Sequence, residues 1–213
     1  MTLESNKTLG GVGALLMIIG PFLGVYTGVL GLIGLILVLI ALKGLSDHYN
    51  EGGIFNNALY GAITAIIGGV VFVAVIVVAA VGFLSDLGID ISTLSDPTAL
   101  SSINWEELVT FDILWPHIAA IFGGLVVLFV FVVVAAIFLR RSLTILSTKT
   151  GVNMFSTTGL LILIGAVLTI IGVGLILLWV ALILLTVAFF SIKTRPAQPP
   201  APTPPPTPPQ QTS

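Results

Sequence analysis

The chain alternates between long apolar runs and short polar segments. Two of these runs, residues 9–42 and 159–192, each hold 34 residues without a charged side chain. A helix of that length would measure about 51 Å, whereas the hydrocarbon core of a bilayer is about 30 Å thick. Each run therefore predicts either one strongly tilted helix or two antiparallel arms of about 25 Å, which local thinning of the bilayer would accommodate.

Residues near the middle of each run favour the two-arm hairpin. The first run contains Gly20-Pro21 followed by Tyr26, and the second contains Gly172 followed by Trp179. Glycine and proline break helices, and tyrosine and tryptophan prefer the membrane–water interface. A hairpin brings these residues to the membrane surface, whereas a single helix would hold them at the bilayer centre.

The alternative is one continuous helix in each run, with Gly20, Gly24 and Gly28 forming a close-packing face. The positive charges distinguish the two: they are Lys7, Lys43, Arg140, Arg141, Lys149, Lys193 and Arg195. With two hairpins the chain crosses the membrane six times, and all seven positive charges lie on one side. With two single helices it crosses four times, and the positive charges divide four to three between the sides. Because lysine and arginine collect in cytoplasmic segments, we expect hairpins, with both termini and the loops 43–57 and 140–158 cytoplasmic.

Two further runs, of 27 and 22 uncharged residues, complete the membrane domain predicted for residues 1–195. In lipid only helices and closed barrels satisfy every backbone hydrogen bond, and runs this long are typical of helices. The predicted fold is an all-α integral membrane protein in which two short helical hairpins flank a longer central pair. The six predicted spans are about 9–24, 26–42, 58–84, 118–139, 159–173 and 175–192. The first span follows a polar lead, residues 1–8, with Ser5 as the predicted helix cap; the run is too long for a signal peptide and is expected to be retained.

The segment 85–116 is predicted to lie outside, since it contains six acidic residues and no lysine or arginine. Asp96-Pro97 and Asn104 predict the starts of two short surface helices. Trp105 and Trp115 are expected to rest at the outer interface.

The tail, residues 196–213, holds nine of the twelve prolines and predicts a disordered, polyproline II-rich segment. It serves either as a tether or as a ligand for a proline-recognising protein.

Composition narrows the function classes. The chain is 57% hydrophobic and 8% charged, which excludes a soluble domain of this size. Its net charge of −2 does not indicate nucleic acid, and the lack of cysteine excludes disulfides, thiolate metal sites and a cysteine nucleophile. The predicted spans contain no Asp, Glu, Lys, Arg or His, which argues against a pump or a proton-coupled carrier.

The two histidines, His48 and His117, are predicted to lie on opposite faces of the membrane, so they cannot share a metal. His48, with Asp47, Tyr49 and Glu51 beside it, is a weak candidate for a metal ligand or a base, and a solvated loop is the simpler interpretation. His117 is interpreted as an interfacial residue.

The acidic residues Asp86, Asp90 and Asp96 lack the alternating spacing of a calcium loop. No catalytic, cofactor-binding or metal residues are therefore predicted.

Residues 1–195 resemble a known family in their layout, and the resemblance is specific mainly over residues 1–61. The segment 4–11, the Gly20-Pro21 break and the runs 43–50 and 53–61 are similar to the domain of unknown function 996 family, uncharacterised archaeal and bacterial multi-pass membrane proteins. Some relatives carry a proline-rich linker and a cysteine-rich zinc ribbon, but without cysteine no zinc ribbon can be carried over. The resemblance implies a membrane fold and no activity.

These observations predict that the chain is a non-enzymatic structural or interaction protein of the cell membrane. Its expected partners are the lipid bilayer and a protein bound by the inner loops or the proline-rich tail; self-association is left open. The alternative is a transporter or channel for a small solute or lipid, without ionisable groups in its spans.

Overall fold

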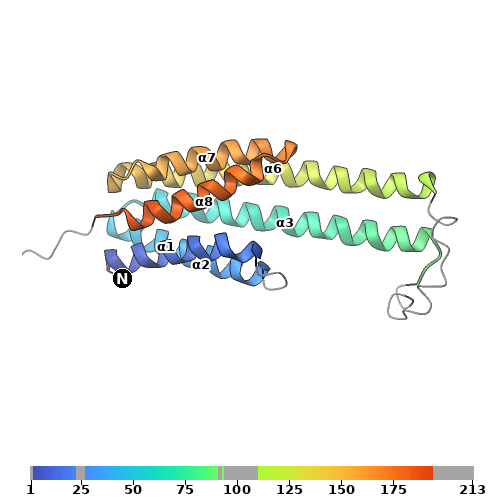
Figure 1. Cartoon of the computed structure of the whole chain (residues 1–213), viewed down its shortest axis with the longest axis horizontal. Helices are drawn as coiled ribbons and strands as arrows, with labels where there is room; N and C mark the ends of the chain where they lie inside the picture. Colours follow the sequence, from blue (N-terminus) through green and yellow to red (C-terminus); the bar gives the residue numbers. More distant parts are fainter. Residues whose placement is uncertain (1, 23–26, 91–92, 94–109, 194–213) are drawn as a thin grey trace, which may run out of the picture.

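The structure, a computed structural model, describes residues 2–22, 27–90, 93 and 110–193, and these residues form an all-α bundle (Figure 1). In chain order its helices are α1 (Leu3–Ile19), the 3₁₀ turn η1 (Gly20–Phe22), α2 (Thr27–His48), α3 (Gly52–Asp86), α6 (Phe111–Thr150), α7 (Met154–Leu168), the 3₁₀ turn η4 (Thr169–Ile171) and α8 (Gly174–Phe190). The two longest, α3 and α6, have 35 and 40 residues and pack along each other. At 1.5 Å per residue they measure about 52 and 60 Å, so they extend well beyond the shorter helices.

Each 34-residue apolar run is broken near its middle into two helices that fold back on each other. In the first, α1 ends in η1, and α2 returns antiparallel to α1. In the second, α7 ends in η4, and Gly172 adopts φ 79°, a left-handed conformation that glycine adopts without strain, before α8 returns. The predicted hairpins are therefore present as helix pairs.

Four of the described helical segments are long and apolar enough to cross a membrane: Gly28–His48, Gly52–Asp86, Phe111–Thr150 and Met154–Ile171. This property indicates a membrane location. Helices α1 and α8 have 17 residues each, about 25 Å, so they are shorter than a typical hydrocarbon core.

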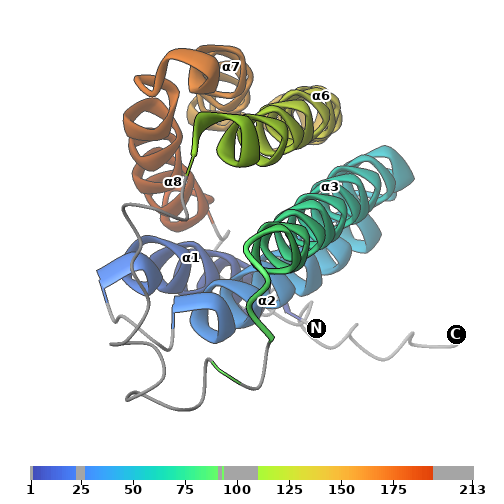
Figure 2. The same ribbon diagram turned by 90° about the vertical axis from the view of Figure 1, so that its right-hand side faces the viewer.

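The six helices form a closed ring, seen end-on in Figure 2. Around it, α1 packs against α2, α2 against α3, α3 against α6, α6 against α7, α7 against α8, and α8 against α1. The α1–α8 contact joins the first and last helices of the membrane domain. Helices α1 and α2 approach closely because Gly13 faces Gly34, and a Cβ at Gly34 would lie 2.6 Å from the Gly13 carbonyl oxygen.

The core is most deeply buried at the end of the bundle where α1 begins and α2, α6 and α8 end, which we call the inner end. The fully buried large side chains gather there; they are Leu42, Leu45, Ile54, Leu146, Phe155, Phe189 and Ile192. The Phe155 and Phe189 rings meet edge to face, with centroids 5.3 Å apart. The opposite end of α3 and α6, called the outer end, is not covered by the two hairpins.

The predicted inner loops are wrong in extent. Residues 43–57 and 140–158 were expected to be loops, but α2 continues to His48 and α3 begins at Gly52, while α6 continues to Thr150 and α7 begins at Met154. Only three residues separate the helices in each case. Polarity marks where the helices leave the apolar zone, but their backbone hydrogen bonds continue into water, so helix ends and span ends differ.

The predicted polar lead is also helical. Helix α1 begins at Leu3, and the cap is Thr2 rather than Ser5, since the Thr2 side chain accepts a hydrogen bond from the Ser5 amide at 3.2 Å.

The predicted outer segment, residues 85–116, is shorter in the structure, since α3 ends at Asp86 and α6 begins at Phe111. Trp115 therefore lies on α6, stacked on Phe111 with ring centroids 5.6 Å apart. The helix starts predicted at Asp96 and Asn104, together with Trp105, lie outside the described residues, as does the tail 196–213.

Candidate functional site

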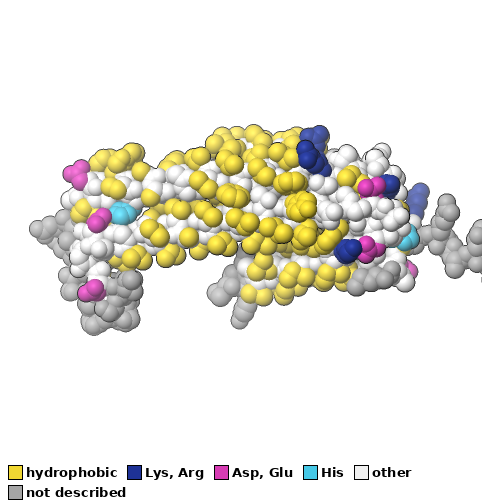
Figure 3. Space-filling model, turned by 180° about the vertical axis from the view of Figure 1, so that it is seen from behind, with side chains coloured by type: hydrophobic (Ala, Val, Ile, Leu, Met, Phe, Trp, Pro, Cys, Tyr) yellow, Lys and Arg dark blue, Asp and Glu magenta, His cyan; other side chains and the backbone are white. Residues whose placement is uncertain are grey.

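Positive charge lies toward the inner end. The described cations are Lys7, Lys43, Arg140, Arg141, Lys149 and Lys193, and all lie on the inner halves of their helices or beside the inner termini. In Figure 3 the lysine and arginine side chains gather toward one end, and a broad hydrophobic surface separates them from acidic side chains at the other. This distribution agrees with the one-sided arrangement expected from the sequence; Arg195 lies outside the described residues.

Two short turns at the inner end are closed in the same way. After α2, the Ser46 hydroxyl donates to the Glu51 carbonyl oxygen at 2.8 Å. After α6, the Ser147 hydroxyl donates to the Val152 carbonyl oxygen at 3.1 Å. Both serines are buried, and each bond spans five residues. A buried hydroxyl that finds such a partner stabilises its turn, because an unpaired one would be costly.

The match between the turns extends to neighbouring positions. Asn50 and Gly151 both have positive φ, 52° and 71°, and Ile54 and Phe155 are both fully buried. The offset is constant, since 151 − 50 and 155 − 54 both equal 101, as does the separation of the two serines. The sequence signal is the pattern Leu-x-x-Leu-Ser, which occurs at 42–46 and at 143–147. The turns are therefore related by an internal structural repeat.

Further contacts join the two turns and the two chain ends. The Ser142 hydroxyl of α6 donates to the Ile54 carbonyl of α3 at 2.6 Å. Lys149 pairs with Glu51 at 3.0 Å, which bridges one turn to the other. Lys7 Nζ donates to the carbonyl oxygen of Ile192, just after α8, at 3.2 Å, and a cation at a helix C-terminus is favourable. The inner end is thus held by side-chain bonds between four helices and both turns.

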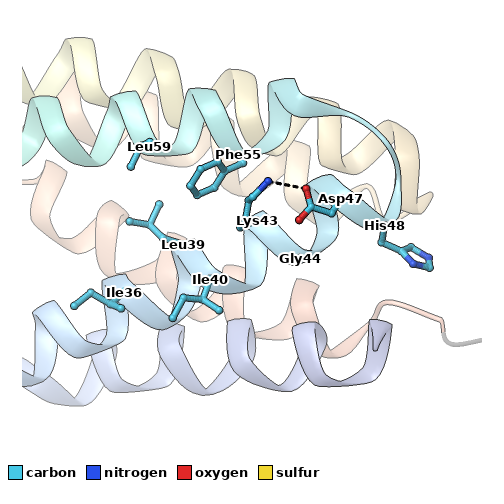
Figure 4. A pocket seen from close by; sticks show the side chains of 9 residues that line it. All are labelled: Ile36, Leu39, Ile40, Lys43, Gly44, Asp47, His48, Phe55 and Leu59. Carbon is cyan, nitrogen blue, oxygen red and sulfur yellow. Dashed lines mark hydrogen bonds and ion pairs between the residues drawn. The ribbon is translucent and has the colours of Figure 1, made fainter. Parts of the chain in front are cut away.

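A groove of about 600 Å³ opens between α2 and α3 near the inner end (Figure 4). Its lining residues are Ile36, Leu39, Ile40, Lys43, Gly44, Asp47 and His48 from α2, with Phe55 and Leu59 from α3. Lys43 Nζ lies 2.7 Å from Asp47 Oδ1 and 5.5 Å from the centroid of the Phe55 ring. The lysine and aspartate side chains are 54% and 62% exposed, and an exposed pair of this kind contributes only about 0.3–0.5 kcal/mol. The pair can therefore rearrange at little cost when another ion approaches.

The polar residues around His48 are engaged with separate partners. Asp47 pairs with Lys43, Glu51 pairs with Lys149, and the His48 ring meets the Tyr49 ring edge to face with centroids 5.0 Å apart. Burial raises the pKa of the Tyr49 phenol above its ordinary value, so it stays protonated at neutral pH. Within the described part of the chain, no group of three or more His, Asp and Glu side chains is placed to hold a metal ion.

His117 lies at the outer end, at the opposite end of the bundle from His48, and it has a partner that the sequence did not reveal. Its Nε2 atom is 2.9 Å from Asp86 Oδ2, which joins the end of α3 to the start of α6. The ring also packs edge to face on Phe83, with centroids 5.6 Å apart. The two partners are 31 residues apart in the chain, so only the antiparallel packing of α3 on α6 brings them together.

Comparison with known proteins supports the resemblance drawn from the sequence. Residues 30–183 match the sequence model of the family described as "Protein of unknown function (DUF996)". An uncharacterised protein of Methanocaldococcus jannaschii is 32% identical over 172 residues, which cover 79% of this chain and 80% of that protein. No solved structure matches the chain. The family match omits residues 1–29, so the segment 4–11 and the Gly20-Pro21 break lie outside it.

Proposed function

We propose that this protein is a non-enzymatic scaffold of the cell membrane. The chain belongs to the DUF996 family of proteins of unknown function. In this proposal the helical ring anchors the protein, and the inner end is a fixed surface on which a protein partner docks. The proline-rich tail, residues 196–213, follows directly from that end and extends its reach.

The use of the buried polar side chains carries this proposal. Five of the six buried polar residues in the described part donate to backbone carbonyls of the chain itself: Ser46, Ser142, Ser147, Thr158 and Thr186. Ser46 and Ser147 brace the two inner turns, and Ser142 joins α6 to α3. A catalytic centre or a solute path needs polar groups directed into open space, whereas these groups are occupied in holding the fold. Such rigidity suits a docking surface, since a preformed surface loses little conformational entropy on binding.

The proposed topology has six membrane crossings, with both termini and both inner turns in the cytoplasm. The charge distribution supports this orientation through the positive-inside rule. The arms α1 and α8 cross where the bilayer is slightly thinned, or where lipid packs around their ends.

The test is partner capture with the full-length protein in its own membrane. Photo-crosslinkers at the exposed positions Thr148 and His48 should trap one defined protein, and the same crosslinker at exposed Ser85, on the outer end, should not trap it. Two variants separate the tail from the inner surface. Loss of the crosslinked partner on truncation after Arg195 would indicate binding through the tail, and loss on the double substitution Arg140→Gln/Arg141→Gln would indicate binding through the inner surface.

The alternative, a small-solute or lipid carrier, predicts a different result. Purified protein in vesicles would then move a substrate across the bilayer, and the rate would rise and saturate with substrate concentration. Such flux, together with no specific crosslink at Thr148 or His48, would overturn the scaffold proposal.

A further inference from the structure

The groove between α2 and α3 has a gradient of polarity along its length. The apolar lining comes from Ile36, Leu39 and Ile40 of α2 and from Leu59 of α3. In Figure 4, Ile36 lies one helical turn beyond Ile40, on the side away from the inner end. Ile36 is 54% exposed, since none of the described helices covers it. The apolar part of the groove therefore offers a surface that only a hydrocarbon chain or another apolar group would cover.

The opposite end of the groove is charged. Lys43 directly follows the apolar run of α2, and Asp47 lies one helical turn further toward the inner end. The Lys43 ammonium lies 5.5 Å from the centroid of the Phe55 ring and pairs with the exposed Asp47 carboxylate, so it stands at the groove and remains open to another anion. Lysine at the end of a span sits where the lipid phosphates lie.

We propose that this groove binds a single membrane phospholipid, with one acyl chain along Ile36, Leu39 and Leu59 and its phosphate at Lys43. The Asp47 carboxylate then accepts a hydrogen bond from a donor in the headgroup, an ammonium or a hydroxyl. The order of apolar wall, cation and anion along the groove matches the order of acyl chain, phosphate and donor group along such a lipid. This inference requires only that the protein lies in a membrane; it does not depend on the scaffold proposal.

Native mass spectrometry of the detergent-purified full-length protein tests the proposal. The probes are phosphatidylethanolamine and phosphatidylglycerol, which carry headgroup donors, phosphatidylcholine, which does not, and diacylglycerol, which lacks the phosphate. We expect one tightly bound lipid, with the first two probes binding more tightly than phosphatidylcholine and with diacylglycerol weakest.

Three substitutions locate the lipid. Lys43→Gln should weaken binding of phosphatidylglycerol about tenfold or more, since it removes a charge-assisted hydrogen bond. Lys193→Gln removes the same charge from an exposed inner position outside the groove and should change binding less than twofold. Asp47→Ala should still bind phosphatidylglycerol through its phosphate at Lys43, but it should abolish the preference of both donor-bearing lipids over phosphatidylcholine.

If Lys43→Gln does not fold, a variant that blocks the groove with a larger side chain tests lipid binding instead. Ile36→Trp fills the apolar part of the groove and should remove the bound lipid, whereas Ile183→Trp, on the exposed surface of α8, should not. Equal binding by the Lys43 and Lys193 variants, or lipid retention in Ile36→Trp, would overturn the proposal, as would binding of diacylglycerol as tight as that of the phospholipids.

Discussion

The side-chain amide of Asn6 lies directly against Gly44, at the point where the start of α1 packs on the end of α2. Asn6 is fully buried, and a Cβ at Gly44 would overlap its amide group. Neither amide atom has a hydrogen-bond partner among the described protein atoms. The pair therefore fixes the spacing of the first hairpin at the inner end by shape.

This contact predicts that Gly44→Ala is destabilising by about 1–3 kcal/mol, the usual cost of overpacking. The free energy of unfolding, measured by titration of the purified protein with sodium dodecyl sulfate, gives the value. Gly31→Ala is the matched control on the same helix, since a Cβ there meets no atom within 4 Å, and it should change stability little.

A double substitution makes the same prediction sharper. The three atoms nearest to a Cβ at Gly44 all belong to Asn6, so Asn6→Ala should relieve the overlap. The double variant should then be more stable than Gly44→Ala alone, and the coupling should be about 1 kcal/mol or more. Additive effects of the two substitutions would show that the overlap does not determine the cost.

The adjacent glycines Gly68 and Gly69 of α3 should differ in their response to alanine. A Cβ at Gly68 would overlap the Phe131 Cβ of α6, whereas a Cβ at Gly69 meets no atom within 4 Å. Gly68→Ala should therefore force α3 and α6 apart and cost about 1–3 kcal/mol, while Gly69→Ala should be close to neutral. Thermal unfolding in detergent compares the two, and equal losses would indicate that the α3–α6 packing is not the one described.

The two serine braces should contribute similarly. Ser46→Ala and Ser147→Ala each remove a buried hydroxyl that holds a turn, so each should lower the free energy of unfolding by about 1 kcal/mol. Thr148→Ala is the control, since this exposed hydroxyl only bonds its own helix at Ile145, and it should cost less than about 0.5 kcal/mol. A neutral Ser147→Ala would contradict the bracing role.

Single cysteines in the natural cysteine-free background test the proposed topology. An impermeant maleimide applied to intact cells should label Ser85→Cys at the outer end rapidly and Thr148→Cys only after permeabilisation. Val173→Cys, between η4 and α8, should also react from outside, but more slowly, because the tip of its hairpin lies beside α6 residues 122–132 rather than at the outer end. Labelling of Val173→Cys only after permeabilisation would overturn the predicted topology.

Much of the architecture was readable from the sequence because it follows from local composition. An uncharged run of 34 residues exceeds the length that one upright crossing needs, and Gly172 marks where the second run turns. Positive charges confined to segments between apolar runs predict a common end without any contact being known. The polar segments misled the prediction of helix ends, since hydration of the side chains does not interrupt backbone hydrogen bonds.

The sequence by itself determined that the chain is helical and that it belongs in a membrane, and it favoured a fold-back in each terminal run over one continuous helix. Only the tertiary structure decided that α1 closes the ring against α8, that Asp86 meets His117, and that Lys43 stands beside Phe55 at the mouth of a groove. The reason is physical: hydrophobicity and helix breaking depend on neighbouring residues, whereas these contacts depend on how rigid helices cross. Crossing is set by shape complementarity between distant small and large side chains, which no local pattern records.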